Sequence, residues 1–162
     1  MRLFKHLFAP SAKRLFPGDS LQRITQAIAD SELRHSGEIC FAVEPALHPR
    51  AVWSGADARS RAHEVFAQLR VWDTAANNGV LLYLLLADHR IEIVADRGFE
   101  GLVSAEQWRG VCQLVEERLR AGEPEAAILR GIEAMSALLT EHFPRTGGSH
   151  DVNELPDLPY VL

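Results

Sequence analysis

Residues 80–95, VLLYLLLADHRIEIVA, decide the fold of this chain. The run over 80–87 is apolar without interruption, which is typical of a strand buried on both faces. Residues 88–89 then supply a two-residue turn, and apolar and polar residues alternate over 90–95. The stretch therefore predicts a tight antiparallel hairpin whose first strand is completely buried.

A further strand is predicted upstream, over 38–44, and it is again apolar on both faces. A helix expected over 57–70 connects this strand to the hairpin, so the two strands should be parallel with a right-handed crossover. Further helices are expected over 19–34, from the cap Ser104 to Gly122, and over 124–143, whereas 45–56 is expected to be a loop. Together these elements predict an α/β fold: a three-layer αβα sandwich in which a small mixed β-sheet is covered by helices on both faces.

Length and composition place the chain among single globular domains. It has 162 residues, of which 47% are hydrophobic and 24% charged, which excludes a disordered, collagen-like or coiled-coil protein. The net charge of −5 argues against a nucleic-acid-binding protein. The charge is uneven, since residues 1–18 carry +4 and residues 145–162 carry −2. We therefore divide the chain into a basic N-terminal leader (1–18), an αβα domain (19–144) and an extended C-terminal tail (145–162).

The leader allows two interpretations. Its large apolar residues, at positions 3, 4, 7 and 8, share one face of a short helix, and its basic residues could meet anionic lipid. Pro10 limits this helix to roughly two turns, which weakens membrane binding. From the sequence we therefore favour a short helix that is docked on the body of the protein.

The chain contains no membrane-spanning sequence, because its longest apolar run has eight residues and a spanning helix needs about 20. The leader also lacks the apolar segment of a secretory signal. The cysteines, Cys40 and Cys112, lie in apolar stretches, as reduced buried thiols do. We expect a cytoplasmic protein, with the leader allowing peripheral association with the inner face of the membrane.

The predicted topology collects polar residues at one edge of the sheet, where the second strand begins and the third ends. Asn77, Asn78 and Asp96 supply amide and carboxylate oxygens there, and these are the ligands that Ca²⁺ and Mg²⁺ prefer. They are therefore the candidate metal ligands, with Arg97 beside them. Carboxylates that could add charge if the loops fold inward are those of Glu38, Asp73 and Glu100. Asn-Asn-Gly and Asp-Arg-Gly are also ordinary turn sequences, and from the residues alone we favour this structural role.

The opposite edge of the sheet carries Glu44, Asp88 and His89. A histidine beside an aspartate can act as an acid–base pair, but at the tip of a hairpin we expect both residues to be solvated turn residues. Motifs for dinucleotide binding, for a P-loop and for a nucleophilic serine elbow are absent from the sequence. The histidines and cysteines also lack the spacing of a zinc site.

Residues 61–99, RAHEVFAQLRVWDTAANNGVLLYLLLADHRIEIVADRGF, resemble a bacterial TPM domain. This family is named after a thylakoid-lumen acid phosphatase, a photosystem repair factor and a nematode receptor modulator. HSGEICFAVE at 35–44 resembles the first-strand segment of the family, and EQW at 106–108 and HFP at 142–144 resemble its later helices. The ending NELPDLPYVL at 153–162 is similar to that of short bacterial members without a signal peptide.

The resemblance implies an αβα sandwich, a divalent-ion site near the loop that enters the second parallel strand and, in some relatives, acid phosphatase activity. It also implies a membrane-associated partner, since bacterial members often accompany LemA-like membrane proteins. Relatives commonly carry Asp-Asn-Gly where this chain has Asn77-Asn78-Gly79. One ligand charge is thus missing, and binding of Ca²⁺ or Mg²⁺ should be weaker or absent.

Two functions therefore compete. The first is a cytoplasmic interaction or accessory module for a membrane-associated partner. The second is a divalent-metal-dependent, acid-phosphatase-like hydrolase at the edge formed by 77–98, with Asp96 and Arg97 as catalytic residues. We expect the first, because the catalytic constellation is incomplete and membership of a family does not fix an activity.

Overall fold

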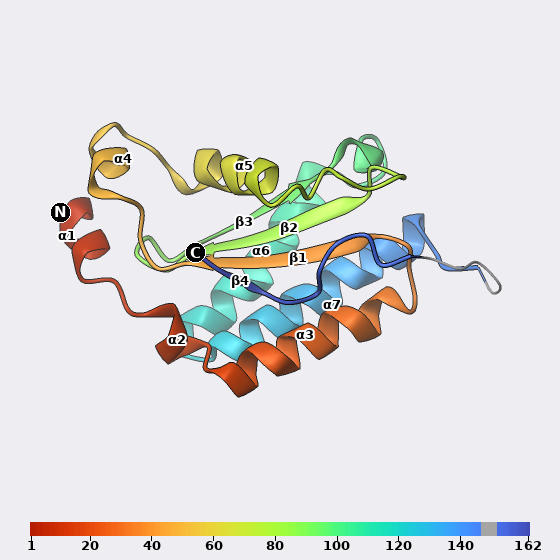
Figure 1. Cartoon of the computed structure of the whole chain (residues 1–162), viewed down its shortest axis with the longest axis horizontal. Helices are drawn as coiled ribbons and strands as arrows, with labels where there is room; N and C mark the ends of the chain where they lie inside the picture. The colour runs from red at the N-terminus through yellow and green to blue at the C-terminus, as the bar shows by residue number, and fades with distance from the viewer. Residues whose placement is uncertain (147–151) are drawn as a thin grey trace.

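A four-stranded mixed sheet lies between two layers of helices in the computed structural model (Figure 1). The structure describes residues 1–146 and 152–162, so 147–151 of the predicted tail lie outside the described residues. In chain order the elements are α1 (Arg2–Leu7), α2 (Ala12–Leu15), α3 (Gly18–Glu32), β1 (Glu38–Glu44), α4 (Pro49–Trp53), α5 (Ala58–Gln68), β2 (Gly79–Leu85), β3 (Arg90–Ala95), the 3₁₀ turn η1 (Arg97–Phe99), α6 (Ala105–Arg120), α7 (Pro124–His142) and β4 (Tyr160–Val161).

The strands follow the order β3-β2-β1-β4 across the sheet. β1 and β2 are parallel, with Phe41 opposite Leu82, and β2 and β3 are antiparallel, with Leu82 opposite Ile93. The predicted antiparallel hairpin and the predicted parallel pair are therefore confirmed, but β2 ends at Leu85 and the turn spans residues 86–89, so the expected two-residue turn was wrong. β4 pairs in parallel with the outer edge of β1, with Val161 opposite Val43, and this strand is not among those predicted from the sequence.

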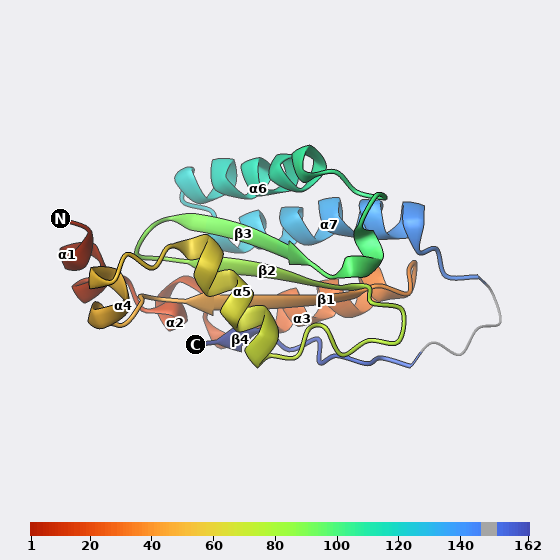
Figure 2. The same cartoon turned by 90° about the horizontal axis from the view of Figure 1, so that it is seen from above.

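Helices cover both faces of the sheet, which confirms the predicted αβα architecture. α3, α6 and α7 pack on one face and α5 packs on the other (Figures 1 and 2). Side chains of successive strand residues point to opposite faces, so Phe41 and Leu82 belong to the core under α3 and α7, whereas Ala42 and Tyr83 belong to the core under α5. This alternation explains why both strands are apolar at every position between their ends.

Capping residues set the ends of the helices that cover the sheet. Asp57 and Ser60 form a capping box at the start of α5, and Ser104 and Gln107 form another at the start of α6. The cap predicted at Ser104 is thus confirmed. Gly122 follows α6 in the left-handed conformation, with φ +79°, which ends the helix before α7 begins.

The leader folds against the body of the protein, as predicted. α1 packs against α4, a short helix that forms within the stretch predicted as a loop over 45–56. The segment around α2 places Ala12 and Phe16 in the main core, where the Phe16 ring meets Phe41 edge-on. None of the helices described in 1–146 and 152–162 combines the length and the apolar composition needed to cross a bilayer.

Candidate functional site

The edge predicted to bind a cation is built from two turns that lie side by side. Gly98 N donates to the Asn77 carbonyl at 2.8 Å, and Asp96 N donates to the Gly79 carbonyl at 2.9 Å. Asn77 adopts a left-handed conformation with φ +53°, which asparagine tolerates better than most residues. A Cβ atom at Gly98 would lie 2.4 Å from the Asn77 carbonyl oxygen, so the two turns can approach this closely only with glycine there.

Two oxygens at this edge have no hydrogen-bond partner although they are buried: Asn78 Oδ1 and Asp96 Oδ2. The other atoms of these side chains are used locally. Asn78 Nδ2 donates to the Ser36 carbonyl at 3.0 Å, and Asp96 Oδ1 accepts from Arg97 N at 2.8 Å and so caps η1. Buried acceptors are normally satisfied, so these two oxygens are the feature of the edge that fits a cation. Asn77 is half-buried and Arg97 is exposed.

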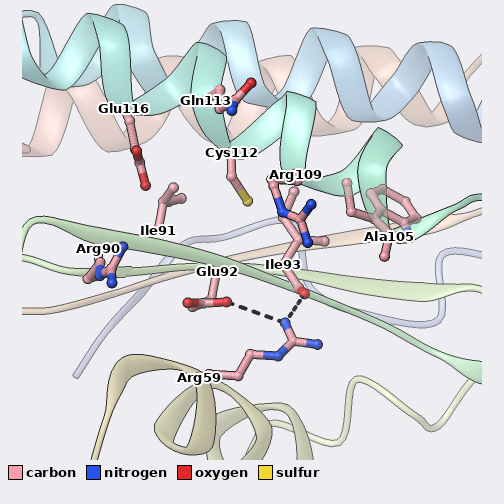
Figure 3. Close-up of a pocket in the computed structure, with 11 residues that line it drawn as sticks. Arg59, Arg90, Ile91, Glu92, Ile93, Ala105, Arg109, Cys112, Gln113 and Glu116 are labelled. Atoms are coloured by element: carbon pink, nitrogen blue, oxygen red, sulfur yellow. Dashed lines mark hydrogen bonds and ion pairs between the residues drawn. The ribbon is translucent and has the colours of Figure 1, made fainter.

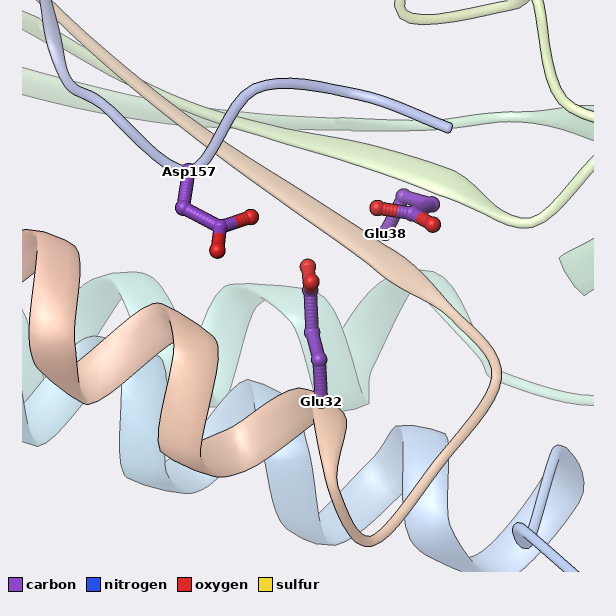
Figure 4. Close-up of side chains that lie close together, drawn as sticks. All are labelled: Glu32, Glu38 and Asp157. Atoms are coloured by element: carbon purple, nitrogen blue, oxygen red, sulfur yellow. The ribbon is translucent and has the colours of Figure 1, made fainter. Parts of the chain in front are cut away.

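A group of three carboxylates that was not predicted from the sequence lies at the same edge (Figure 4). Glu38, Glu32 and Asp157 come from β1, α3 and the tail, and one oxygen of each lies within 4.8 Å of the others. Ile39 N donates to Glu32 Oε1 and Glu154 N donates to Glu38 Oε1, both at 2.9 Å. The sequence pointed to Glu38 alone, because the other two carboxylates reach it only after α3 and the tail have folded.

The carboxylate group holds a proton at neutral pH. Burial in a cavity of about 150 Å³ raises the pKa of the Glu32 carboxyl to about 9, and the nearby charges of Glu38 and Asp157 raise it further. The hydrogen bond from Ile39 N opposes this shift. Glu32 is therefore neutral under most conditions, and the group is less anionic than three carboxylates suggest.

At the opposite edge, Asp88 is not the solvated turn residue expected from the sequence. Its carboxylate accepts from Arg2 Nη2 at 2.8 Å and lies 3.1 Å from His6 Nε2. His6 Nδ1 accepts from Leu47 N at 3.0 Å, so the proton of the neutral ring is on Nε2 and is donated to Asp88. The expectation was wrong because the partners of Asp88 lie in the leader, far away in the sequence. We call this set of contacts the leader latch.

The leader latch cannot act as an acid–base pair. Both ring nitrogens of His6 are occupied within the protein, and its side chain is only 1% exposed. His89, the neighbour of Asp88 in the sequence, has a φ of +50° and serves the hairpin turn. The nearby Glu44 carboxylate is also satisfied, by two hydrogen bonds from Arg61 at 2.9 and 3.1 Å and by one from Tyr83 Oη at 2.6 Å.

Comparison with known proteins gives the family. The family model described as the TPM domain matches residues 12–138. The chain belongs to the TPM domain family. The resemblance stated from the sequence is therefore confirmed. No curated protein matches this TPM domain.

Two solved structures share the fold of this TPM domain. The NMR structure of the BA42 protein from the psychrophilic bacterium Bizionia argentinensis superposes with a TM-score of 0.79 at 27% identity, covering 91% of this chain and 95% of that one. The N-terminal domain of a P. gingivalis protein superposes with a TM-score of 0.64 at 19% identity, covering 84% and 85% of the two chains. The second match shows the fold alone.

A groove of about 540 Å³ runs along β3 of this TPM domain, between α5 and α6 (Figure 3). Arg59 reaches from α5 across the outer edge of β3, where it donates to the Ile93 carbonyl and pairs with Glu92. Cys112 lines the groove, but burial raises the pKa of its thiol to about 12. The groove therefore offers no thiolate nucleophile at neutral pH, and Arg59 covers the edge of the strand.

The other unusual surface of this TPM domain lies at the end formed by α1 and α4, where both helices protrude beyond the sheet (Figure 2). Large apolar side chains are exposed there; they are Met1, Leu3, Phe4, Leu7, Phe8 and Trp53. We call this set the N-terminal face. Its existence follows from the way in which α1 docks: the leader latch uses the polar residues of the helix, and the apolar residues are left in solvent.

Proposed function

We propose that this TPM domain is an interaction module that docks on a membrane-associated partner through the N-terminal face. One observation carries the proposal: α1 is held to the body by Arg2 and His6, while the large apolar residues of α1, and Phe8 directly after it, are exposed. A helix that served only the stability of the fold would bury its apolar side. The reversed orientation is typical of a surface that another molecule covers.

Saturation of the polar groups near the N-terminal face supports a binding role over catalysis there. The carboxylates of Asp88 and Glu44 are both engaged in charged hydrogen bonds. A general acid or base must be able to reach a substrate proton, and these two carboxylates are held in place by their hydrogen-bond partners inside the protein. A LemA-like membrane protein is the partner that the family resemblance implies.

Sedimentation with inverted inner-membrane vesicles, which present the cytoplasmic leaflet outward, tests the proposal. We expect the wild-type chain to sediment with these native vesicles and the Leu7→Ser/Phe8→Ser variant to stay in the supernatant. Both side chains are exposed, so the variant should fold normally. The matched control is Leu158→Ser, which removes an exposed leucine elsewhere. Equal sedimentation of wild type and the double variant contradicts the proposal.

The unpartnered oxygens of Asn78 and Asp96 favour a second candidate function, a divalent-metal-dependent phosphatase at the 77–98 edge. The residues present fit Ca²⁺ or Mg²⁺ in part, since they offer one carboxylate and amide oxygens, and Asn77 stands where relatives commonly have an aspartate. A bound cation would supply charge for a phosphate ester. Arg97 is exposed beside Asp96, and its guanidinium group would bind the phosphate of the ester.

Hydrolysis of a chromogenic phosphate monoester tests this second candidate, with Ca²⁺, Mg²⁺ or Mn²⁺ and with chelator. It predicts metal-dependent turnover that Asp96→Asn abolishes, since the substitution keeps the cap of η1 but removes the charge. Asp73→Asn, on an exposed residue of the preceding turn, should retain the activity. Rates that are equal with metal and with chelator, or equal in wild type and Asp96→Asn, exclude the phosphatase.

A further inference from the structure

We infer that the N-terminal face binds lipid directly, and that its partner is a bilayer leaflet rich in anionic phospholipids. The inference rests on the proposed function, and it assigns lipid, in place of a membrane protein, as what the N-terminal face contacts. It requires that the shape, the side-chain types and the charge of the face all fit a lipid surface better than a protein groove.

The shape of the face favours a soft partner. Phe8 is 81% exposed and Trp53 is 89% exposed, so both rings stand out from the surface. They come from α1 and α4, which pack together at the tip of the molecule (Figures 1 and 2). Protruding aromatic rings can enter the boundary between lipid headgroups and acyl chains, where tryptophan and phenylalanine are favoured.

The charge around the face is positive although the whole chain is negative. Lys5 and Arg50 lie on the same two helices as the aromatic rings, and both are exposed. α2, next along the chain, adds the exposed Lys13 and Arg14. The stretches 1–18 and 45–56 contain no acidic residue, whereas the chain as a whole carries −5. Basic residues beside an apolar surface match an anionic leaflet.

Two acidic residues, Asp88 and Asp57, lie close enough to Arg2 of the leader to act on its charge. Asp88 forms an ion pair with Arg2 and accepts a hydrogen bond from the neutral His6 ring within the leader latch. Asp57 accepts from Ser60 N in the capping box of α5. Both carboxylates stay charged, but among the described residues neither forms an ion pair with Lys5 or Arg50, so these two cations remain available to lipid phosphates.

The leader latch also explains how so short a helix could bind a membrane. α1 has six residues, too few for a stable isolated helix in water. Because Arg2, His6 and Leu47 fix it to the body, the helix is already formed before it meets lipid. The entropic cost of ordering this segment on binding is therefore small.

Protein-free vesicles test the lipid partner. Untagged wild-type chain is mixed with liposomes of phosphatidylcholine alone or of phosphatidylcholine with anionic phosphatidylglycerol, and the bound fraction is measured by flotation. We expect binding to anionic liposomes that is more than tenfold stronger than to neutral ones and that falls as salt is raised. Phe8→Ser/Trp53→Ser should reduce it at least tenfold, whereas the exposed pair Trp72→Ser/Leu158→Ser should not change it.

Charge reversal gives an independent readout. Each basic residue near an anionic surface contributes roughly fivefold to binding, so Lys5→Glu/Arg50→Glu should reduce binding to anionic liposomes by more than tenfold. Arg118→Glu/Arg130→Glu makes the same change in net charge on exposed residues of α6 and α7 and should be nearly neutral. Circular dichroism of all variants confirms that the fold is retained.

The two proposals fail in different ways. If native membranes retain the chain but protein-free anionic liposomes do not, the partner is a membrane protein: the lipid inference is overturned and the proposed function stands. If neither retains it, both are overturned. Binding to liposomes that is unaffected by Phe8→Ser/Trp53→Ser also overturns the inference, because the lipid then contacts another surface.

Discussion

The wild-type protein should lose stability as the pH rises because of Glu32, and replacing Glu32 by glutamine should remove this loss. The folded protein keeps the Glu32 carboxyl protonated up to a pKa of about 9, whereas the ordinary pKa of a glutamate carboxyl is 4.5. Between these values the unfolded chain has lost a proton that the folded chain still holds, so unfolding releases it. Stability from this group is therefore complete below the unfolded pKa and is lost as pH rises towards the folded pKa.

The size of the effect follows from the shift. One proton changes the free energy of unfolding by about 1.4 kcal/mol per pH unit, which sets a ceiling of about 4 kcal/mol between pH 5 and pH 8. Solvent reaches the cavity beside Glu32, and this screening reduces the expected loss to about 2 kcal/mol. Glutamine keeps the acceptor for Ile39 N and offers an N–H to Asp157, so Glu32→Gln should not show this loss.

Guanidinium denaturation at pH 5.0, 6.5 and 8.0 measures the difference. Glu38, Asp157 and Arg145 line the same cavity and are kept in both proteins, so the two proteins differ only in the group at position 32. Glu133→Gln, on an exposed residue of α7, is the control for loss of a surface charge. Parallel pH profiles for wild type and Glu32→Gln would refute the argument that Glu32 is neutral in the folded protein.

Three further outcomes follow from the described contacts. Asp88→Ala leaves Arg2 and His6 without their carboxylate, so it should lower the free energy of unfolding by about 2–4 kcal/mol and speed proteolysis within the leader. Unchanged proteolysis would show that α1 is held by other contacts. Gly79→Ala should prevent folding or destabilise the protein by more than about 3 kcal/mol, because the added Cβ would lie 2.0 Å from the Val71 carbonyl oxygen. Thermal melting measures this, and a melting temperature equal to that of wild type would show that the turn can shift. The thiols of Cys40 and Cys112 should resist a disulfide reagent at pH 8 until the protein is denatured, because burial raises the pKa of each thiol to about 12. Rapid labelling of either thiol in the native protein would contradict this prediction.

The hairpin over 80–95 was predictable because its evidence is local: an apolar run, turn residues and an alternating strand follow one another in the sequence. The length of the turn was not, because the apolar residues at 86 and 87 look like part of the strand. β4 and α4 were missed because two and five residues are too few to show a period. Either element forms only because the body of the protein provides a partner for it.

Local evidence also limited the prediction of sites. Asn77, Asn78 and Asp96 could be placed at one edge, because strand order alone brings their segments together. The pairing of Asp88 with the leader and the approach of Asp157 to Glu32 depend on chain ends that carry no signal of where they will dock. The outward orientation of the apolar residues in α1 likewise depends on which side of the helix the body captures.

The pairing of β4 with β1 has a consequence for the order of events during synthesis. Ala42 and Val43 are synthesised well before their strand partners, Tyr160 and Val161, which lie more than a hundred residues later in the sequence. At about 5–20 residues per second, the edge of β1 stays unpaired on the ribosome for on the order of ten seconds. Neighbouring nascent chains on one messenger would present the same open edge, so the pairing of β4 with β1 ends the period in which strands of two chains can pair.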